Sequence, residues 1–235
     1  MAFENPVSFQ GSAGDSDASV AAAQSTFMAR VYRWMFVGLG VTGAVAWYTA
    51  NSPAMLQVVM PMMMPLLIGE LVLVLALSWL APRVSGTVAA GLFLVYAAVN
   101  GLTFSVIFLA YQLGSIGEVF VLTGAVFGAM SLYATVTKKD LSGWGAFLFM
   151  GLVGVIVAGI FNLFIRSDMM GFVLACASVV IFAGLTAYDT QKLRRFHASA
   201  GYSAAASLSI VGALMLYLDF INLFLALLRL FGRRR

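Results

Sequence analysis

Apolar runs of about 20 residues, separated by short polar breaks, repeat along most of the chain. Seven such runs follow residue 33, at about 34–50, 61–81, 87–110, 118–136, 144–165, 170–190 and 209–230. A helix of about 20 apolar residues is long enough to span the hydrocarbon core of a bilayer. The runs are continuous rather than alternating, which excludes a transmembrane β-barrel. The pattern therefore predicts an all-α membrane protein with seven transmembrane helices.

Both ends of the chain are polar. Residues 1–24 are mostly small and polar, and we interpret them as a disordered tail. Residues 25–33 mix aromatic, apolar and arginine side chains, which suits a short interfacial helix that leads into the membrane. We therefore divide the chain into a polar N-terminal tail (1–24), a seven-helix transmembrane domain (25–230) and a basic C-terminal tail (231–235).

The composition agrees with a membrane protein and narrows the range of functions. Hydrophobic residues make up 62% of the chain and charged residues 9%, whereas soluble domains carry about 25% charged residues. The chain has one histidine and one cysteine, so a Ser-His-Asp triad in the membrane, a histidine-based metal site and an intramolecular disulfide all lack their parts. The composition therefore argues against an enzyme. The net charge of +4 sits in loops and the tail, so we expect no nucleic-acid partner.

Lysine and arginine residues indicate the orientation of the chain in the membrane. Alternate polar segments carry eight of them, and the loops of the opposite side carry only Arg166; the eight are Arg30, Arg33, Arg83, Lys138, Lys139, Lys192, Arg194 and Arg195. Basic loops favour the cytoplasmic side, so the N-terminus is predicted to be cytoplasmic. The arginines after residue 228 do not fit this orientation, because it places them on the non-cytoplasmic side of the membrane. Either the last helix does not cross fully, or the earlier loops decide the orientation.

Two aspartates in the last two runs are the main candidates for a functional site. Asp219 and Asn222 share a face of the last helix, and Asp189 ends the preceding run. Ideal helices leave the two carboxylates at different depths, so they meet only if the last helix begins late or tilts. If they meet, they share a proton and act as a latch, or bind Ca²⁺ through hard oxygen ligands. Alternatively, Lys192, Arg194 or backbone groups neutralise each carboxylate separately.

Two further charged residues are candidates for the same pathway. Glu70 lies inside the second run, where it either pairs with a polar neighbour such as Asn100 or Asn162 or lines an ion path. Arg83 lies just past the end of that run and is either a salt-bridge partner for the aspartates or an anchor at the membrane surface.

Several stretches together resemble the Bax inhibitor-1 family, also called the YccA or TMBIM family, of seven-helix membrane proteins. The polar N-terminal segment is similar to that of bacterial members. The matching stretches are NGLTFS at 100–105, TKKDLS at 137–142, GIFNLF at 159–164, TAYDTQ at 186–191 and LYLDFINLF at 216–224. They cover the third to seventh runs in order, and the last two are the most specific.

The resemblance implies a fold and a function. The fold is six helices around a central C-terminal helix, in a bacterial inner membrane. The implied function is a pH-sensitive Ca²⁺ leak or a Ca²⁺/H⁺-linked transporter. The two aspartates that form the gate in this family match Asp189 and Asp219 here, and an arginine such as Arg83 can hold that pair through a salt bridge. The resemblance implies no cofactor other than the Ca²⁺ ion itself. The alternative is a non-transporting interaction protein that modulates a membrane protease complex.

Overall fold

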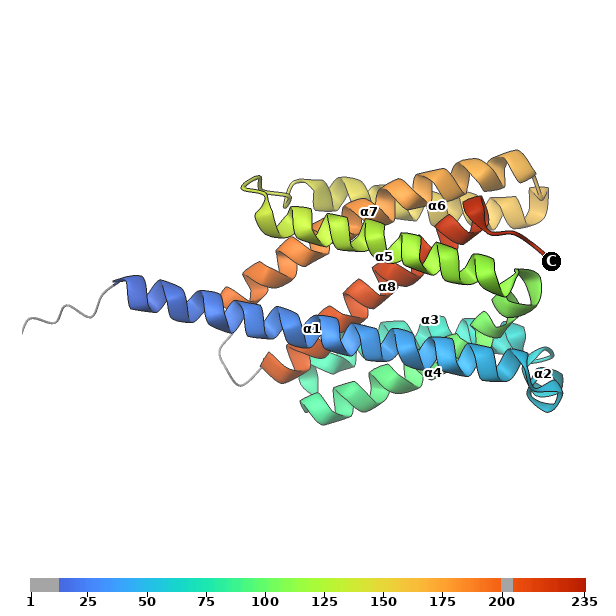
Figure 1. The fold of residues 1–235 in the computed structure, drawn as a ribbon, viewed down its shortest axis with the longest axis horizontal. Coiled ribbons are helices and arrows are strands. Elements are labelled where there is room, and N and C mark those ends of the chain that lie inside the picture. The colour runs from blue at the N-terminus through green and yellow to red at the C-terminus, as the bar shows by residue number, and fades with distance from the viewer. Residues whose placement is uncertain (1–12, 200–204) are drawn as a thin grey trace, which may run out of the picture.

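The computed structural model describes residues 13–199 and 205–235, and this part of the chain is helical almost throughout. It contains eight α-helices and one 3-10 turn, η1, that ends the third of them. The elements are α1 (Ala13–Ala50), α2 (Pro53–Val59), α3 (Met63–Leu80), η1 (Ala81–Arg83), α4 (Gly86–Ala110), α5 (Leu113–Val136), α6 (Trp144–Ile165), α7 (Asp168–Ser199) and α8 (Ala205–Phe231). Apart from short α2, the helices run back and forth along one axis (Figure 1).

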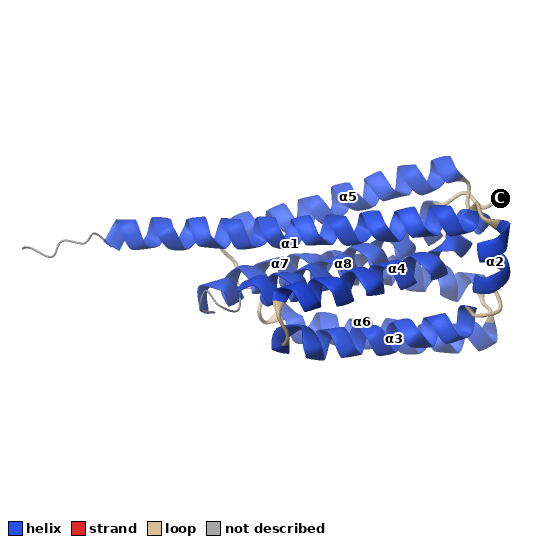
Figure 2. Cartoon of the chain, turned by 90° about the horizontal axis from the view of Figure 1, so that it is seen from below, coloured by secondary structure: helices blue, strands red, loops and turns tan. Residues whose placement is uncertain are grey.

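The last helix lies at the centre of the bundle. α8 crosses between the other helices and packs against α1, α4, α5 and α7 (Figures 1 and 2). Of its apolar span, 72% is buried inside the protein, against 6% for the span that contains α3 and 11% for α6. α3 rests on α4 and η1, and α6 rests on α7, so both expose most of their apolar surface. Most of the surface of α8 is therefore shielded from lipid.

Six helices of the described chain are long and apolar enough to span a membrane. These spans are Met63–Arg83, Gly86–Ala110, Leu113–Val136, Trp144–Ile165, Asp168–Arg195 and Ala206–Phe231. α1 is not among them, although the sequence predicts its second half as a span. That half, residues 34–50, contains three glycines and two threonines, which lower its hydropathy. The structure thus supports six apolar spans where the sequence predicts seven.

α1 is a single long helix that combines two segments the sequence separates. It begins at Ala13, so residues 13–24, expected to belong to a disordered tail, continue the same helix as residues 25–50. The first part of α1 projects beyond the rest of the bundle (Figure 2). Residues 1–12 of the expected tail lie outside the described residues.

The second half of α1 packs closely along α4 and α8. Its buried side chains recur every three or four residues, as expected for one helix face: Met35, Leu39, Thr42, Ala46 and Thr49. Gly101 of α4 faces this stripe. A methyl group at Gly101 would lie 2.7 Å from the carbonyl oxygen of Thr42 and 2.8 Å from Cβ of Val45. The absence of a side chain at Gly101 therefore allows α1 and α4 to approach.

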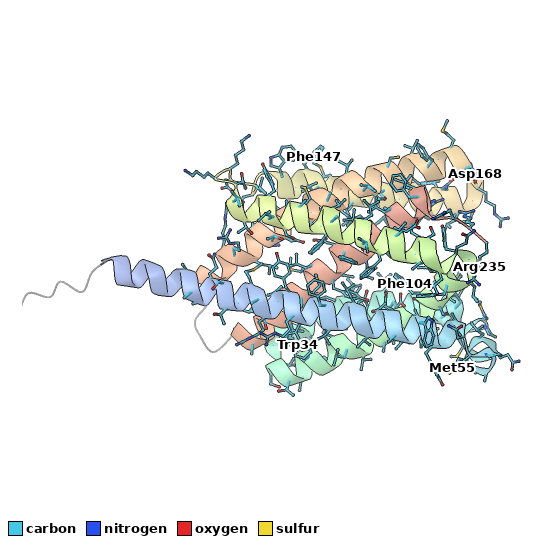
Figure 3. All side chains as sticks on the ribbon, viewed as in Figure 1. Trp34, Met55, Phe104, Phe147, Asp168 and Arg235 are labelled. Atoms are coloured by element: carbon cyan, nitrogen blue, oxygen red, sulfur yellow. The ribbon has the colours of Figure 1, made fainter. Side chains whose placement is uncertain are left out.

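The C-terminal tail lies at the end of the bundle opposite to the start of α1. Asp168 and Arg235 both lie at that end (Figure 3), so α8 crosses the whole bundle, and the idea that the last helix stops short is wrong. The tail is fastened to the start of α5: Arg233 forms an ion pair with Glu118 at 2.6 Å, and its backbone N–H donates to Ser115 Oγ at 2.9 Å.

Candidate functional site

Asp219 is the most deeply buried acidic residue that the structure describes. It sits in the middle of α8 with 5% of its surface exposed. Its Oδ2 atom is buried and has no hydrogen-bond partner among the described residues. An unpaired carboxylate oxygen inside a membrane protein is unfavourable, because neither water nor a donor compensates for the lost hydration. Such a residue is a functional candidate.

Asp189 approaches Asp219 because α7 and α8 form a long antiparallel hairpin. α7 continues to Ser199, well past the predicted end near residue 190. Leu193 of α7 lies opposite Gly212 of α8, where a methyl group on Gly212 would be 2.9 Å from Cδ2 of Leu193. From this contact, Asp189 lies four residues back along α7 and Asp219 lies seven residues further along α8. The two aspartates therefore differ in level by three residues, or about 4.5 Å along the axis.

Of the two ways in which the carboxylates were expected to meet, a late start of the last helix is wrong, and a tilt agrees with the inclined course of α8 (Figure 1). α8 instead begins at Ala205, earlier than predicted, and the longer α7 compensates. At this register two ionised carboxylates would repel each other. Lys192 lies one turn further along α7 than Asp189. Asp189 itself is half-buried.

Arg83 does not reach the two aspartates. Its guanidinium donates a hydrogen bond to the carbonyl oxygen of Trp79 and lies over the Trp79 ring, 4.4 Å from the centroid. Among the residues that the structure describes, no ion pair joins Arg83 to an acidic side chain. Its position agrees with the anchoring alternative rather than with a salt bridge to the pair.

Glu70 has a different partner from those that the sequence suggests. Its Oε1 accepts a hydrogen bond of 2.6 Å from Thr103 Oγ1 of α4. The two asparagines considered as partners are engaged elsewhere: Asn100 Oδ1 accepts from the Tyr217 hydroxyl, and Asn162 Oδ1 accepts from the backbone N–H of Ser167. The hydrogen bond between Glu70 and Thr103 joins the exposed helix α3 to the core.

A buried polar cluster lies beside Glu70 and joins α1, α4 and α8. The Tyr217 hydroxyl lies 2.7 Å from Thr42 Oγ1 and donates to Asn100 Oδ1 at 3.2 Å. Thr42 Oγ1 also donates to the carbonyl oxygen of Ala97 at 2.9 Å. Thr42, Thr103 and Tyr217 are not among the site residues predicted from the sequence. Tyr217 and Asp219 are two residues apart on α8, so their side chains point about 200° apart.

Asn222 is only loosely connected to either polar centre. It is half-buried, and its Nδ2 donates to the carbonyl oxygen of Leu218 in its own helix at 2.8 Å. Within the described part of the chain, no group of three or more His, Cys, Asp or Glu residues is placed to hold a metal ion. Asp189 and Asp219 would therefore supply only part of the six to eight oxygen ligands that Ca²⁺ takes.

Comparison with known proteins gives consistent matches over nearly the whole chain. The family model described as "Inhibitor of apoptosis-promoting Bax1" matches residues 24–235. The inner membrane protein YbhL of Escherichia coli (strain K12) is 46% identical over 227 residues, covering 94% of this chain and 97% of that protein. An uncharacterized protein of Deinococcus radiodurans is 44% identical over 211 residues, covering 89% and 91%. An uncharacterized membrane protein of Streptococcus pyogenes is 40% identical over 213 residues, covering 88% and 92%.

Proposed function

Because this chain belongs to the Bax inhibitor-1 family, we propose that it is a pH-sensitive Ca²⁺ leak channel or Ca²⁺/H⁺-linked transporter, gated by Asp189 and Asp219. It is a multi-pass protein of a bacterial inner membrane, like its E. coli relative. We further propose that the second half of α1 forms a seventh span, because its buried stripe follows α4 and α8 along their length. The end that carries most of the lysines and arginines, with the N-terminus, is then cytoplasmic.

The burial of Asp219 is the observation that carries the proposal. A carboxylate with an unpaired oxygen in the most buried helix costs stability, and a purely structural position in such a helix favours an apolar side chain. In the register of α7 and α8, Asp189 lies about three residues from the level of Asp219. Paired carboxylates in a bilayer are typical of sites that handle protons or cations.

The proposed gate works through the proton content of the pair. When the two carboxylates share one proton, a hydrogen bond between them holds α7 and α8 together. When both are ionised they repel each other, and their oxygens become ligands for a cation. A change of pH therefore changes both the packing of the hairpin and the charge that a passing ion meets.

The path beyond the gate is proposed to follow the polar side chains around α8. Glu70 offers a carboxylate at the boundary between α3 and α4, and Asn222 offers an amide one turn past Asp219. Since α3 packs mainly on α4 and η1 and exposes most of its apolar surface, it can shift with little loss of packing when the hairpin opens. The Glu70–Thr103 hydrogen bond would be the contact that breaks.

The decisive experiment measures Ca²⁺ flux into liposomes that contain the purified protein, at pH 6 and pH 8. Wild type is compared with Asp189→Asn and Asp219→Asn, which keep the side-chain shape and remove the charge. Asp168→Asn is the matched control, because Asp168 is exposed at the other end of α7. We expect a pH-dependent flux in wild type and the control, and a flux that no longer varies with pH in both gate variants. A pH response that is equal in all four proteins would contradict the gate.

A second function stays open, namely an interaction protein without transport of its own that modulates a membrane protease complex. The observation that favours it is the first part of α1, which projects from the bundle and precedes the region matched by the family model. Flux no higher than in empty liposomes would favour this alternative. Deletion of residues 1–24 then distinguishes the two, because it would abolish binding of the partner but leave a channel's flux unchanged.

A further inference from the structure

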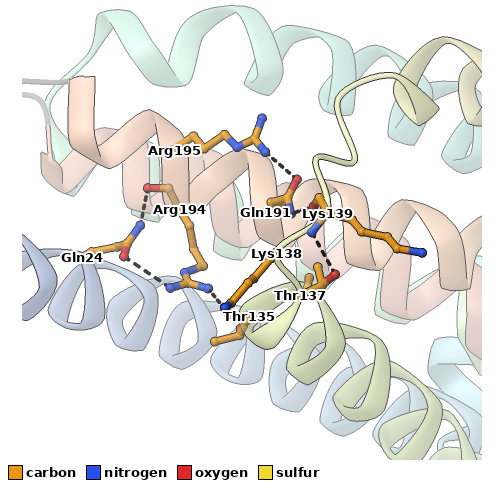
Figure 4. A pocket seen from close by; sticks show the side chains of 9 residues that line it. Gln24, Thr135, Thr137, Lys138, Lys139, Gln191, Arg194 and Arg195 are labelled. Atoms are coloured by element: carbon orange, nitrogen blue, oxygen red, sulfur yellow. Dashed lines mark hydrogen bonds between the residues drawn. The ribbon is translucent and has the colours of Figure 1, made fainter.

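A hollow with basic walls lies at the end of the bundle from which the first part of α1 projects. Its volume is about 290 Å³, close to the lower limit for small-ligand pockets. It is formed by α1, the end of α5, the α5–α6 loop and the last turns of α7 (Figure 4). The lining residues are Gln24, Ala134, Thr135, Thr137, Lys138, Lys139, Gln191, Arg194 and Arg195.

The hollow carries an excess of positive charge. Lys138 and Lys139 are exposed, and their ammonium groups have no hydrogen-bond or ion-pair partner in the part of the chain that the structure describes. Arg194 bonds only to neutral acceptors, at 2.7 Å to the carbonyl oxygen of Thr135 and at 3.5 Å to Gln24 Oε1. Asp140, just outside the lining, pairs with Arg195 at 2.8 Å. This bond, with a smaller contribution from Ser142, holds the pKa of Asp140 well below its usual range. Among the side chains that the structure describes, one carboxylate thus lies beside these four cations.

The loop that carries the two lysines is held in place before any ligand arrives. Gln191 of α7 is buried and bonds to the loop at two points. Its Nε2 donates to the carbonyl oxygen of Lys139 at 2.9 Å, and its Oε1 accepts from the backbone N–H of Leu141 at 2.8 Å. A loop whose backbone is already ordered loses less entropy when an anion binds to it. The cations can therefore act together on one ligand.

The hollow lies at the level where the apolar spans end. The candidate span in α5 ends at Val136 and the one in α7 ends at Arg195. The residues of these two helices that line the hollow lie close to those two ends. Leu132 and Val136 share one face of the last turns of α5, next to the lining residues in the chain, and they are 63% and 71% exposed. An acyl chain can lie along this face while its head group reaches the cations.

We propose that this hollow binds the phosphate head group of an anionic phospholipid from the adjacent leaflet. Phosphate is the anion that lysine and arginine clusters at a membrane surface recognise, and the adjoining apolar face distinguishes a lipid from a free phosphate. A bound head group would hold the α5–α6 loop and α1 against the part of α7 that begins two residues beyond Asp189. The proposal does not depend on whether the protein conducts Ca²⁺.

The test measures lipid binding to the purified protein in detergent by native mass spectrometry. The probes are phosphatidylglycerol, zwitterionic phosphatidylcholine and soluble glycerol 3-phosphate. The pocket variant is Lys138→Gln with Lys139→Gln. The matched control is Arg30→Gln with Arg33→Gln, which removes the same charge from exposed positions at the same end, outside the hollow. A third variant, Lys138→Arg with Lys139→Arg, keeps the charge.

We expect the Kd of phosphatidylglycerol to rise about tenfold or more in the pocket variant and to stay at the wild-type value in the control and in the arginine variant. An equal loss in the control variant would overturn the site, because it would indicate a diffuse surface attraction. Equal binding of phosphatidylcholine would overturn the role of charge. Glycerol 3-phosphate binding as tightly as the lipid would overturn the lipid assignment in favour of a soluble anion.

Discussion

At the scale of single residues, Tyr217 joins three helices through one hydroxyl group. We expect Tyr217→Phe to lower the free energy of unfolding by about 1–3 kcal/mol. The substitution removes the partner of Thr42 Oγ1 and leaves Asn100 Oδ1 without its donor in a buried position. Thr42 keeps its bond to Ala97, which limits the loss. Denaturant unfolding of the purified protein in detergent measures the change.

Tyr96→Phe is the control for this prediction. Tyr96 is also buried and packs edge-on against Tyr217, with ring centroids 5.9 Å apart. Its hydroxyl has no hydrogen-bond partner among the described residues, so the same substitution should cost less there. Equal losses for the two variants would mean that Tyr217 contributes through its ring rather than through the hydrogen bonds.

The same residues explain what the sequence could and could not predict about the site. An acidic residue inside an apolar run is conspicuous, because placing its charge in the membrane costs free energy. Asp189, Asp219 and Glu70 could therefore be identified from the sequence. Threonine gives no such signal, because its hydroxyl can bond to its own helix, as Thr186 does with Phe182. Whether Thr42 or Thr103 reaches another helix depends on which face packs where. That information lies in the tertiary structure.

At the scale of helices, the contact between α1 and α4 depends on Gly101. We expect Gly101→Ala to destabilise the protein by about 1–3 kcal/mol, because the new methyl group would meet the backbone of α1 and no side-chain rotation can relieve the clash. Gly91→Ala in the same helix is the control, since a methyl group there meets nothing within 4 Å. Thermal unfolding in detergent compares the two. A loss of equal size at both positions would point to the helix backbone instead of the α1–α4 contact.

The limits of the helices were harder to predict than their existence. Hydropathy shows where a chain leaves the membrane, but a helix can continue into water. α7 does so through Lys192, Arg194 and Arg195, which are good helix formers. The extension matters for function, because it sets the register that brings Asp189 near Asp219. α1 likewise starts at Ala13 in a segment whose small polar residues resemble a disordered tail.

At the scale of the whole molecule, basic side chains are unevenly divided between the two ends of the bundle. The end from which the first part of α1 projects carries the α5–α6 loop and the end of α7, with Lys138, Lys139, Arg194 and Arg195. The opposite end carries the C-terminal arginines, of which Arg233 is paired with Glu118. The positive-inside rule counts lysines and arginines whether or not they are paired, so this ion pair does not change the count. The segments of the first end carry eight of these residues, against Arg166 and the four arginines after residue 228 on the other side, and the proposed orientation follows from this excess.

This orientation predicts on which side of the membrane chosen positions react with an impermeant maleimide. Cys176 is the single cysteine, so Cys176→Ala provides an unreactive background into which Ala21→Cys, Asn51→Cys, Ser142→Cys and Arg235→Cys are introduced one at a time. All four positions are exposed. We expect Asn51 and Arg235 to react from the periplasmic side in cells with a permeabilised outer membrane, and Ala21 and Ser142 to react only once the inner membrane is opened. The results at positions 21 and 51 together test α1 directly. If Ala21→Cys and Asn51→Cys react from the same side, α1 does not cross, and the protein has six spans. If Ser142 reacts from outside and Arg235 does not, the loop lysines do not determine the orientation, and the proposed gate faces the periplasm.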